Sequence, residues 1–113
     1  MRVIGIDIGT TTMCALVLDT DIGKVLEDKT IWNDTSIKSS KKFESIQDAE
    51  QIAEKARLLV EELIGRWKPI KGIGITGQMH GIVYVGEQGT AVSPLYTWQD
   101  GRGNEKTKKG ETY

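Results

Sequence analysis

The chain has little of what builds disulfide scaffolds or metal clusters. Its 113 residues include one cysteine, two prolines and one histidine. Because Cys14 is alone, no intramolecular disulfide can form, and we expect a soluble protein in a reducing cytoplasm. No second histidine or cysteine cluster accompanies the single histidine, so we do not expect zinc.

The chain also lacks a strong excess of charge of either sign, and it lacks long apolar runs. Lys and Arg number 15 against 16 Asp and Glu, a formal net charge of -1. We therefore expect no nucleic-acid or membrane partner. Asp7 interrupts the first apolar run too early for a signal peptide, and no run is long enough to span a bilayer. This length predicts at most one domain with a modest core.

The chain does have an apolar strand pattern that ends in a turn of hydroxyls. Residues 3–8 are rich in β-branched side chains and predict a strand buried on both faces, interrupted by Asp7. Gly9 permits a tight bend, and the three threonines after it offer hydroxyls and N–H groups that suit phosphate oxygens. Two interpretations stay open: a nucleotide-phosphate and metal site, or a turn capped by Asp7.

Two further strands are predicted over residues 15–18 and 24–32, and short turns make the three pair antiparallel. Residues 33–42 are polar and predict a surface loop. Apolar residues then recur at helical spacing over 46–67, with Ser45 and Asp48 as a variant capping box. Gly65 and Pro69 bracket the end of this helix.

After the helix, residues 71–76 predict a strand, which implies an α/β layer with one crossover. Residues 82–85 predict a further strand, and 91–92 and 95–98 look extended. From Gly101 onward the chain is polar and is expected to fray.

The glycines at 72, 74 and 77 match the letters of a dinucleotide fingerprint, G-x-G-x-x-G. That fingerprint needs a strand before it and a helix after it. Here a helix precedes and a strand follows, so dinucleotide binding is not expected. The glycines instead suit close packing of the strand on neighbouring backbone.

His80 follows the end of a predicted strand, where α/β sheets bind ligands. An imidazole can donate to and accept from a hydroxyl, although a lone histidine is often structural. Trp98, Asp100 and Arg102 place an aromatic ring, a carboxylate and a guanidinium within five residues. They suit a sugar, or they form an ordinary surface ion pair.

Taken together, these stretches resemble the N-terminal part of the FGGY carbohydrate kinases. The resemblance is carried by GIDIGTTT at 5–12, GITGQMHG at 74–81 and WQDGR at 98–102. The Gln-Met-His form of the middle stretch is similar to the xylulose and sedoheptulose kinase branch.

The resemblance implies an α/β fold of the ribonuclease H-like class (actin/hexokinase ATPase group), in which a three-strand antiparallel meander, a helix and further strands form a mixed sheet. It also implies ATP and Mg²⁺ as cofactors, and transfer of the ATP γ-phosphoryl to a hydroxyl of a small sugar of the ketose class. Asp7 would orient the magnesium. The ATP phosphates would contact Gly9, Thr10, Thr11 and Thr12, and the sugar would contact Gln78, Met79, His80, Trp98, Asp100 and Arg102.

Two departures from the family pattern stand out. Members commonly carry Lys or Arg where this chain has Cys14. No aspartate matches the family's general base, and the adenosine pocket belongs to a second lobe. We therefore expect residues 1–113 to be an N-terminal fragment of the first, sugar-binding domain, inactive alone, since a lost base costs about 10²–10⁴ in rate. Apolar surface left by the second lobe suggests self-association.

Two alternatives come from other classes. A non-catalytic sugar-binding or regulatory module of the same fold would keep the sugar-facing residues. A nuclease of the ribonuclease H-like group needs clustered carboxylates for two metals, and only Asp7 holds such a strand position. The nuclease is not expected.

Overall fold

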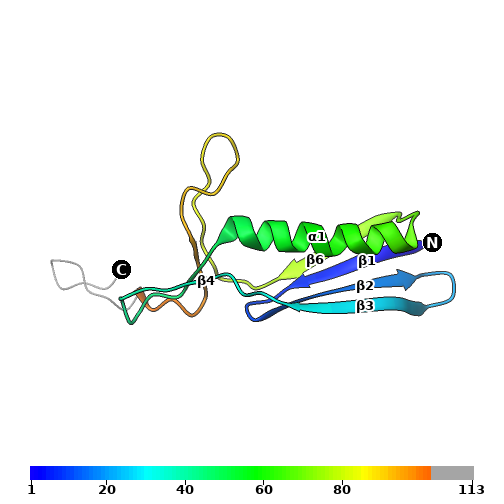
Figure 1. The fold of residues 1–113 in the computed structure, drawn as a ribbon, viewed down its shortest axis with the longest axis horizontal. Helices are drawn as coiled ribbons and strands as arrows, with labels where there is room; N and C mark the ends of the chain where they lie inside the picture. Colours follow the sequence, from blue (N-terminus) through cyan, green and yellow to red (C-terminus); the bar gives the residue numbers. More distant parts are fainter. Residues whose placement is uncertain (103–113) are drawn as a thin grey trace. The chain divides into compact units, whose positions relative to one another are not determined.

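The computed structural model describes residues 1–102, which form two compact units. The first unit combines Met1–Asp34 with Gln51–Gln78, and the second combines Thr35–Glu50 with the chain from Met79. The expected fraying from Gly101 onward falls mostly on residues 103–113, outside the described part. The elements are β1 (Arg2–Ile8), β2 (Thr12–Asp19), β3 (Lys24–Trp32), β4 (Ser36–Ile37), β5 (Ile46–Gln47), α1 (Ala49–Trp67), β6 (Gly72–Gly77) and β7 (Leu95–Tyr96) (Figure 1).

The first unit is a four-stranded mixed sheet covered by α1. Its strand order is β3-β2-β1-β6, and the first three strands pair antiparallel in sequence order. β6 returns after the helix to pair with β1 in parallel. The predicted meander, helix and crossover strand are thus confirmed. No helix within residues 1–102 combines the length and apolar content needed to cross a bilayer.

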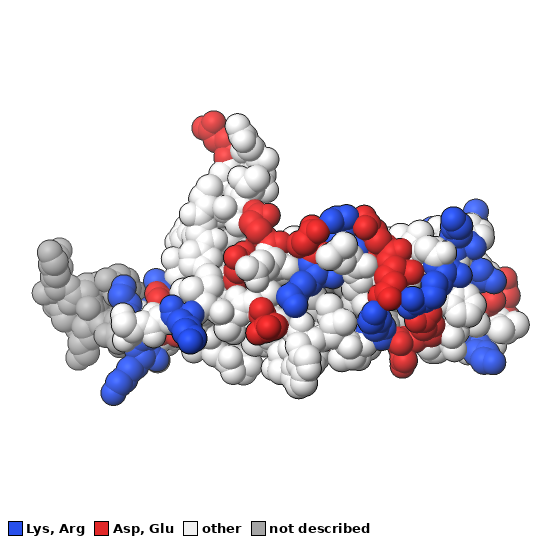
Figure 2. All heavy atoms as spheres, in the orientation of Figure 1, with Lys and Arg blue, Asp and Glu red and all other residues white. Residues whose placement is uncertain are grey.

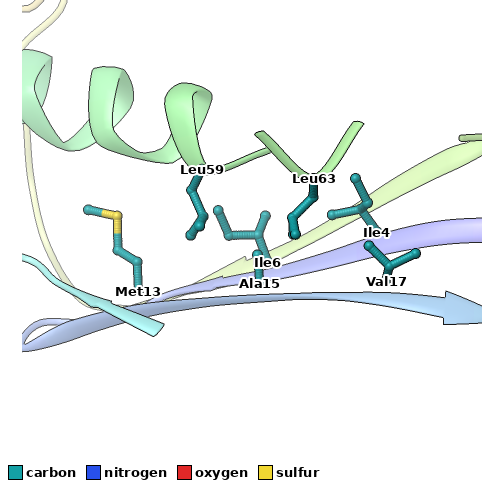
Figure 3. Packing of buried hydrophobic residues seen from close by; sticks show 7 residues of the cluster. All are labelled: Ile4, Ile6, Met13, Ala15, Val17, Leu59 and Leu63. Carbon is teal, nitrogen blue, oxygen red and sulfur yellow. The ribbon is translucent and has the colours of Figure 1, made fainter. Parts of the chain in front are cut away.

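The core lies between one face of the sheet and α1. Side chains alternate along a strand, so every second residue of β1 and β2 points toward the helix. Figure 3 shows these side chains meeting two leucines that descend from α1. The buried cluster consists of Ile4, Ile6, Met13, Ala15, Val17, Leu59 and Leu63.

The expectation that β1 is buried on both faces is wrong. Ile4 and Ile6 are 1% and 4% exposed, whereas Asp7 is exposed on the opposite face. Within the described residues a single helix covers the sheet, so the alternation of β1 divides it into a buried side and an open side. The carboxylate therefore escapes the desolvation cost that the sequence pattern suggested.

Several ion pairs lie on the surface of the first unit. On α1, Arg57 pairs with Glu54 and Glu61, and Arg66 pairs with Glu27 of β3. Figure 2 shows both signs interspersed over the visible face of the helix. This mixture agrees with the near-zero net charge and produces no single-sign field there.

The start of α1 differs from the sequence prediction. The helix begins at Ala49, because Ile46 and Gln47 pair as β5 with β4 and β7. Ser45 does not cap it: its hydroxyl lies 2.6 Å from the Thr97 hydroxyl. Pairing into a sheet has overridden the helical spacing at this end.

The second unit contains a small antiparallel sheet of order β4-β5-β7. Two predictions were wrong in extent. The loop expected over 33–42 includes β4, and the strand expected over 82–85 is reduced to isolated bridges from Ile82 to Tyr96 and from Val85 to Ala91. Short strands of this kind bury little surface, so local sequence signals place them poorly.

The turn between β1 and β2 needs glycine at position 9. The Gly9 N–H donates to the Thr12 carbonyl over 2.9 Å, and a Cβ at Gly9 would lie 2.8 Å from that same oxygen. The predicted tight bend is confirmed. Close packing at the later glycines holds for Gly77, where a Cβ would lie 3.0 Å from the Ile8 carbonyl, but not for Gly74, where it would meet nothing within 4 Å.

Two side chains from other strand ends hold this turn. Asn33, 1% exposed, donates from its amide nitrogen to the Gly9 carbonyl over 2.7 Å, and its own N–H donates to the Thr11 carbonyl over 2.8 Å. On the other side, the Thr10 hydroxyl donates to the Gln78 side-chain oxygen over 2.9 Å. The turn is therefore fixed by its neighbours as well as by its own backbone.

The core can be tested with two adjacent leucines of α1. Leu59 is 3% exposed and Leu58 is 52% exposed. We expect Leu59→Ala to lower the free energy of unfolding by about 2–5 kcal/mol because it leaves a cavity. For Leu58→Ala, the free energy of unfolding should stay within about 0.5 kcal/mol of that of the unsubstituted chain. Urea unfolding followed by circular dichroism measures both, and equal losses would contradict the packing described.

The turn is tested by Asn33→Ala. Removing the buried amide leaves the Gly9 carbonyl without this donor, and we expect a loss of about 1–3 kcal/mol in the free energy of unfolding. Amide hydrogen exchange at Gly9 should also accelerate. The matched control is Asp34→Ala at the exposed neighbouring position, which should change neither quantity. Unchanged exchange at Gly9 in the Asn33 variant would show that Asn33 does not hold the turn.

Candidate functional site

The first unit carries a carboxylate beside the hydroxyl turn. Asp7 lies near the carboxyl end of β1, opposite Cys14 of β2 and Thr76 of β6. All three belong to the open face of the sheet, where they border a hollow of about 510 Å³. Cys14 presents a thiol where a basic residue would offer a positive charge, so this strand position contributes nothing to neutralising an anion.

Asp7 and the hydroxyl turn suit magnesium better than they suit a metal ion whose ligands all come from protein side chains. Within residues 1–102 there is no group of three or more His, Cys, Asp or Glu side chains that could hold an ion. Mg²⁺ keeps several waters and is commonly held by one or two carboxylates together with substrate phosphates. An exposed Asp7 near a turn with hydroxyls fits that kind of coordination.

The second unit contains a hollow of about 360 Å³, a size that suits a small ligand. It gathers aromatic rings, an imidazole and one oppositely charged pair. The lining residues are His80, Ile82, Tyr84, Tyr96, Thr97, Trp98, Asp100 and Arg102.

Four of the six residues predicted to bind sugar therefore lie around one hollow: His80, Trp98, Asp100 and Arg102. The other two do not line it. Met79 is 72% exposed, and Gln78 belongs to the first unit, where it accepts the hydrogen bond from Thr10. The structure thus associates Gln78 with the hydroxyl turn.

His80 has a backbone conformation that is uncommon for its residue type. Its φ is 62°, in the left-handed region that glycine adopts most easily. Such conformations persist where the surrounding structure determines them, and they gather at functional sites. Here the conformation accompanies an exposed imidazole at the edge of the hollow.

Asp100 and Arg102 form a pair that is more than a surface contact. The Asp100 side chain is 4% exposed and accepts from Arg102 Nε over 2.9 Å and from the Ser45 N–H over 3.0 Å. The guanidinium carbon of Arg102 lies 4.1 Å from the Tyr96 ring centroid. The Asp–Arg ion pair of the alternative interpretation is present, with the Arg102 side chain 39% exposed and the Asp100 side chain buried.

A second carboxylate, Glu44, contacts the same guanidinium. Its Oε2 accepts from Arg102 Nη2 over 2.6 Å, and its Oε1 accepts from the Ser39 hydroxyl. Hydrogen bonds from Ser39 and then Arg102 outweigh desolvation and hold the pKa of Glu44 below its usual value. Arg102, bonded to two carboxylates, has its own pKa raised.

The pKa of Asp100 reflects two opposing effects. Burial raises it, and hydrogen bonds from the Arg102 side chain and from the Ser45 and Arg102 N–H groups lower it more. The pKa therefore lies below the usual range of an aspartate. Both carboxylates are ionised at neutral pH.

Sequence reasoning missed two tyrosines that line this hollow and a carboxylate that is bonded to one of its lining residues. Tyr96 precedes the Trp98 stretch by two positions, a spacing that could have suggested a shared face in an extended segment. Tyr84 packs edge-on against Tyr96, with ring centroids 6.4 Å apart. Glu44 lies 58 residues before Arg102, and no local pattern announces that contact.

Comparison with known proteins agrees with the resemblance seen in the sequence. The chain is similar to xylulose kinases from Staphylococcus epidermidis, at 29% identity over 96% of this chain and 22% of that protein, and from Staphylococcus xylosus, at 30% over 94% and 22%. The solved xylulose kinase from Rhodospirillum rubrum matches with a TM-score of 0.78 and 27% identity over 91% of this chain and 21% of that one.

These comparisons confirm the ribonuclease H-like α/β class. The chain spans about a fifth of the length of the curated relatives it matches. The model of the FGGY family of carbohydrate kinases, N-terminal domain, matches residues 2–111. The chain therefore belongs to the FGGY family of carbohydrate kinases.

Proposed function

We propose that this chain contributes a phosphate turn and a ketose pocket to ATP-dependent phosphorylation of a sugar. The observation that carries the proposal is the hollow that gathers His80, Trp98, Asp100 and Arg102. Family membership supports the reaction class, and the relatives' description as xylulose kinases supports a ketose. The residues taken to bind sugar and phosphate are part of this proposal.

In the hollow, the sugar would meet three kinds of contact. Trp98, 54% exposed, offers a ring face to the C–H groups of a sugar. The ionised Asp100 can only accept hydrogen bonds, so it would receive a sugar hydroxyl. His80 can both donate and accept. A neutral polyol satisfies all three together.

In the first unit, the turn would hold phosphate. Thr10, Thr11 and Thr12 would offer hydroxyl and backbone donors to phosphate oxygens, and Gly9 keeps the bend tight enough to present them. Asp7 would orient magnesium, through water. When bound, the ion would neutralise charge on the phosphates.

We propose further that residues 1–113, as part of the first, sugar-binding domain, do not turn over alone. None of their aspartates matches the family's general base, and the adenosine pocket is expected in a second lobe. Much of the roughly 7–11 kcal/mol that positioning can supply would therefore be missing. A reducing cytoplasm is the proposed location, because the single Cys14 cannot form an internal disulfide.

The second candidate is a non-catalytic sugar-binding or regulatory module. The thiol of Cys14, in place of a basic residue, favours it because one phosphate-neutralising charge is absent. The two candidates differ in nucleotide binding. At the turn, the kinase part should bind the phosphates of Mg-ATP even though the adenosine pocket is absent, whereas the module should bind sugar alone.

Calorimetry with D-xylulose tests the ketose pocket, and Trp98 offers a matched pair of variants. We expect the chain to bind D-xylulose and Trp98→Ala to weaken binding about tenfold or more, since the ring contact is lost. Trp32→Ala, at a tryptophan 69% exposed on β3, should leave the affinity unchanged.

The same samples, mixed with Mg-ATP and D-xylulose, should give no steady formation of sugar phosphate. Sustained turnover would contradict the proposed inactivity. Equal loss of D-xylulose affinity in both tryptophan variants would contradict the assignment of the hollow. Sugar binding without any Mg-ATP binding would favour the module.

A further inference from the structure

Arg102 is the one arginine or lysine that lines the hollow within the described residues, and its Nε and Nη2 donors are directed at protein carboxylates. Nε donates to Asp100 Oδ1 over 2.9 Å, and Nη2 donates to Glu44 Oε2 over 2.6 Å. The flat faces of the guanidinium are also engaged, since its carbon lies 4.1 Å from the Tyr96 centroid and 5.7 Å from that of Phe43.

The position of Glu44 is set by the backbone on both sides of it. The Gly101 N–H donates to the Phe43 carbonyl over 2.6 Å, and the Ser45 N–H donates to Asp100 Oδ2 over 3.0 Å. Glu44 therefore sits on a segment tied directly to the turn that carries Asp100 and Arg102. Its side chain is 16% exposed and is held from the other end by Ser39.

The carboxylates around Arg102 offset its positive charge. One guanidinium faces two ionised carboxylates, so this part of the hollow carries no surplus positive charge. Lys41, whose Nζ lies 6.0 Å from the Phe43 ring centroid, does not line the hollow. A ligand carboxylate would meet the negative charge of Asp100, and the Nη2 donor that a paired contact would use is already bonded to Glu44.

We propose that this pocket selects uncharged sugars and rejects sugars that carry a carboxylate, with Glu44 as the specificity-determining residue. Arginine binds carboxylates through paired N–H donors, and Glu44 occupies one of the donors that such a pair would use. The inference rests on the proposed function, because it specifies which sugars the ketose pocket admits. The lowered pKa of Glu44 is consistent with it, since Glu44 stays charged at neutral pH.

The experiment compares two five-carbon ligands, neutral D-xylulose and D-xylonate, the carboxylate of its aldose isomer D-xylose, by titration of the whole chain at pH 7. We expect D-xylulose to bind about tenfold or more tightly than D-xylonate. In Glu44→Gln, which removes one of the two negative charges bonded to Arg102, D-xylonate affinity should rise about tenfold while D-xylulose affinity changes by less than about threefold. The gain should shrink as salt is added.

Two control variants separate the charge of Glu44 from general effects. Glu87→Gln removes the same charge from an exposed position of the same unit that has no hydrogen bond to Arg102, and it should change neither affinity. Glu44→Asp keeps the charge and should keep the rejection of D-xylonate. Circular dichroism shows whether each variant folds. The comparison of D-xylulose with D-xylonate in the unsubstituted chain needs no variant.

Three results of these titrations would each overturn a different part of the proposal. Equal binding of the two ligands by the unsubstituted chain, or tighter binding of D-xylonate, overturns the inference and leaves the sugar site intact. Discrimination that survives unchanged in Glu44→Gln overturns the role of Glu44. Failure to bind either ligand overturns the inference together with the proposed sugar site.

Discussion

One-sided burial of β1 is the constraint on which the first unit depends. Ile4 and Ile6 must face α1 to build the core, and the alternation of a strand then leaves Asp7 on the open face. A shift of one residue in register would bury the carboxylate under the helix and expose the isoleucines. The position of the candidate magnesium ligand thus follows from packing of the core.

The periodic parts of the fold could be predicted from the sequence. Helical spacing predicted α1, and short turns predicted the meander of β1 to β3, because both signals are local. The start of α1 could not be predicted, since Ser45 hydrogen-bonds to Thr97 instead of capping the helix. A contact 52 residues away decided that choice.

The candidate sites show the same division between local and distant signals. Motif letters identified Asp7, His80, Trp98, Asp100 and Arg102, whose chemistry is visible in a short stretch. Asn33 and Glu44 carried no such signal, although one holds the hydroxyl turn and the other the pocket guanidinium. Each reaches its partner only after the chain has folded, so their roles follow from the three-dimensional contacts.

The most direct test of the central claim, that the hollow of the second unit is a sugar pocket, is a map of D-xylulose binding by NMR on the whole chain. We expect the largest shifts at the Trp98 indole N–H, the His80 amide and the Arg102 Nε–H. Saturable shifts confined to other residues, with these three signals unmoved, would contradict that claim.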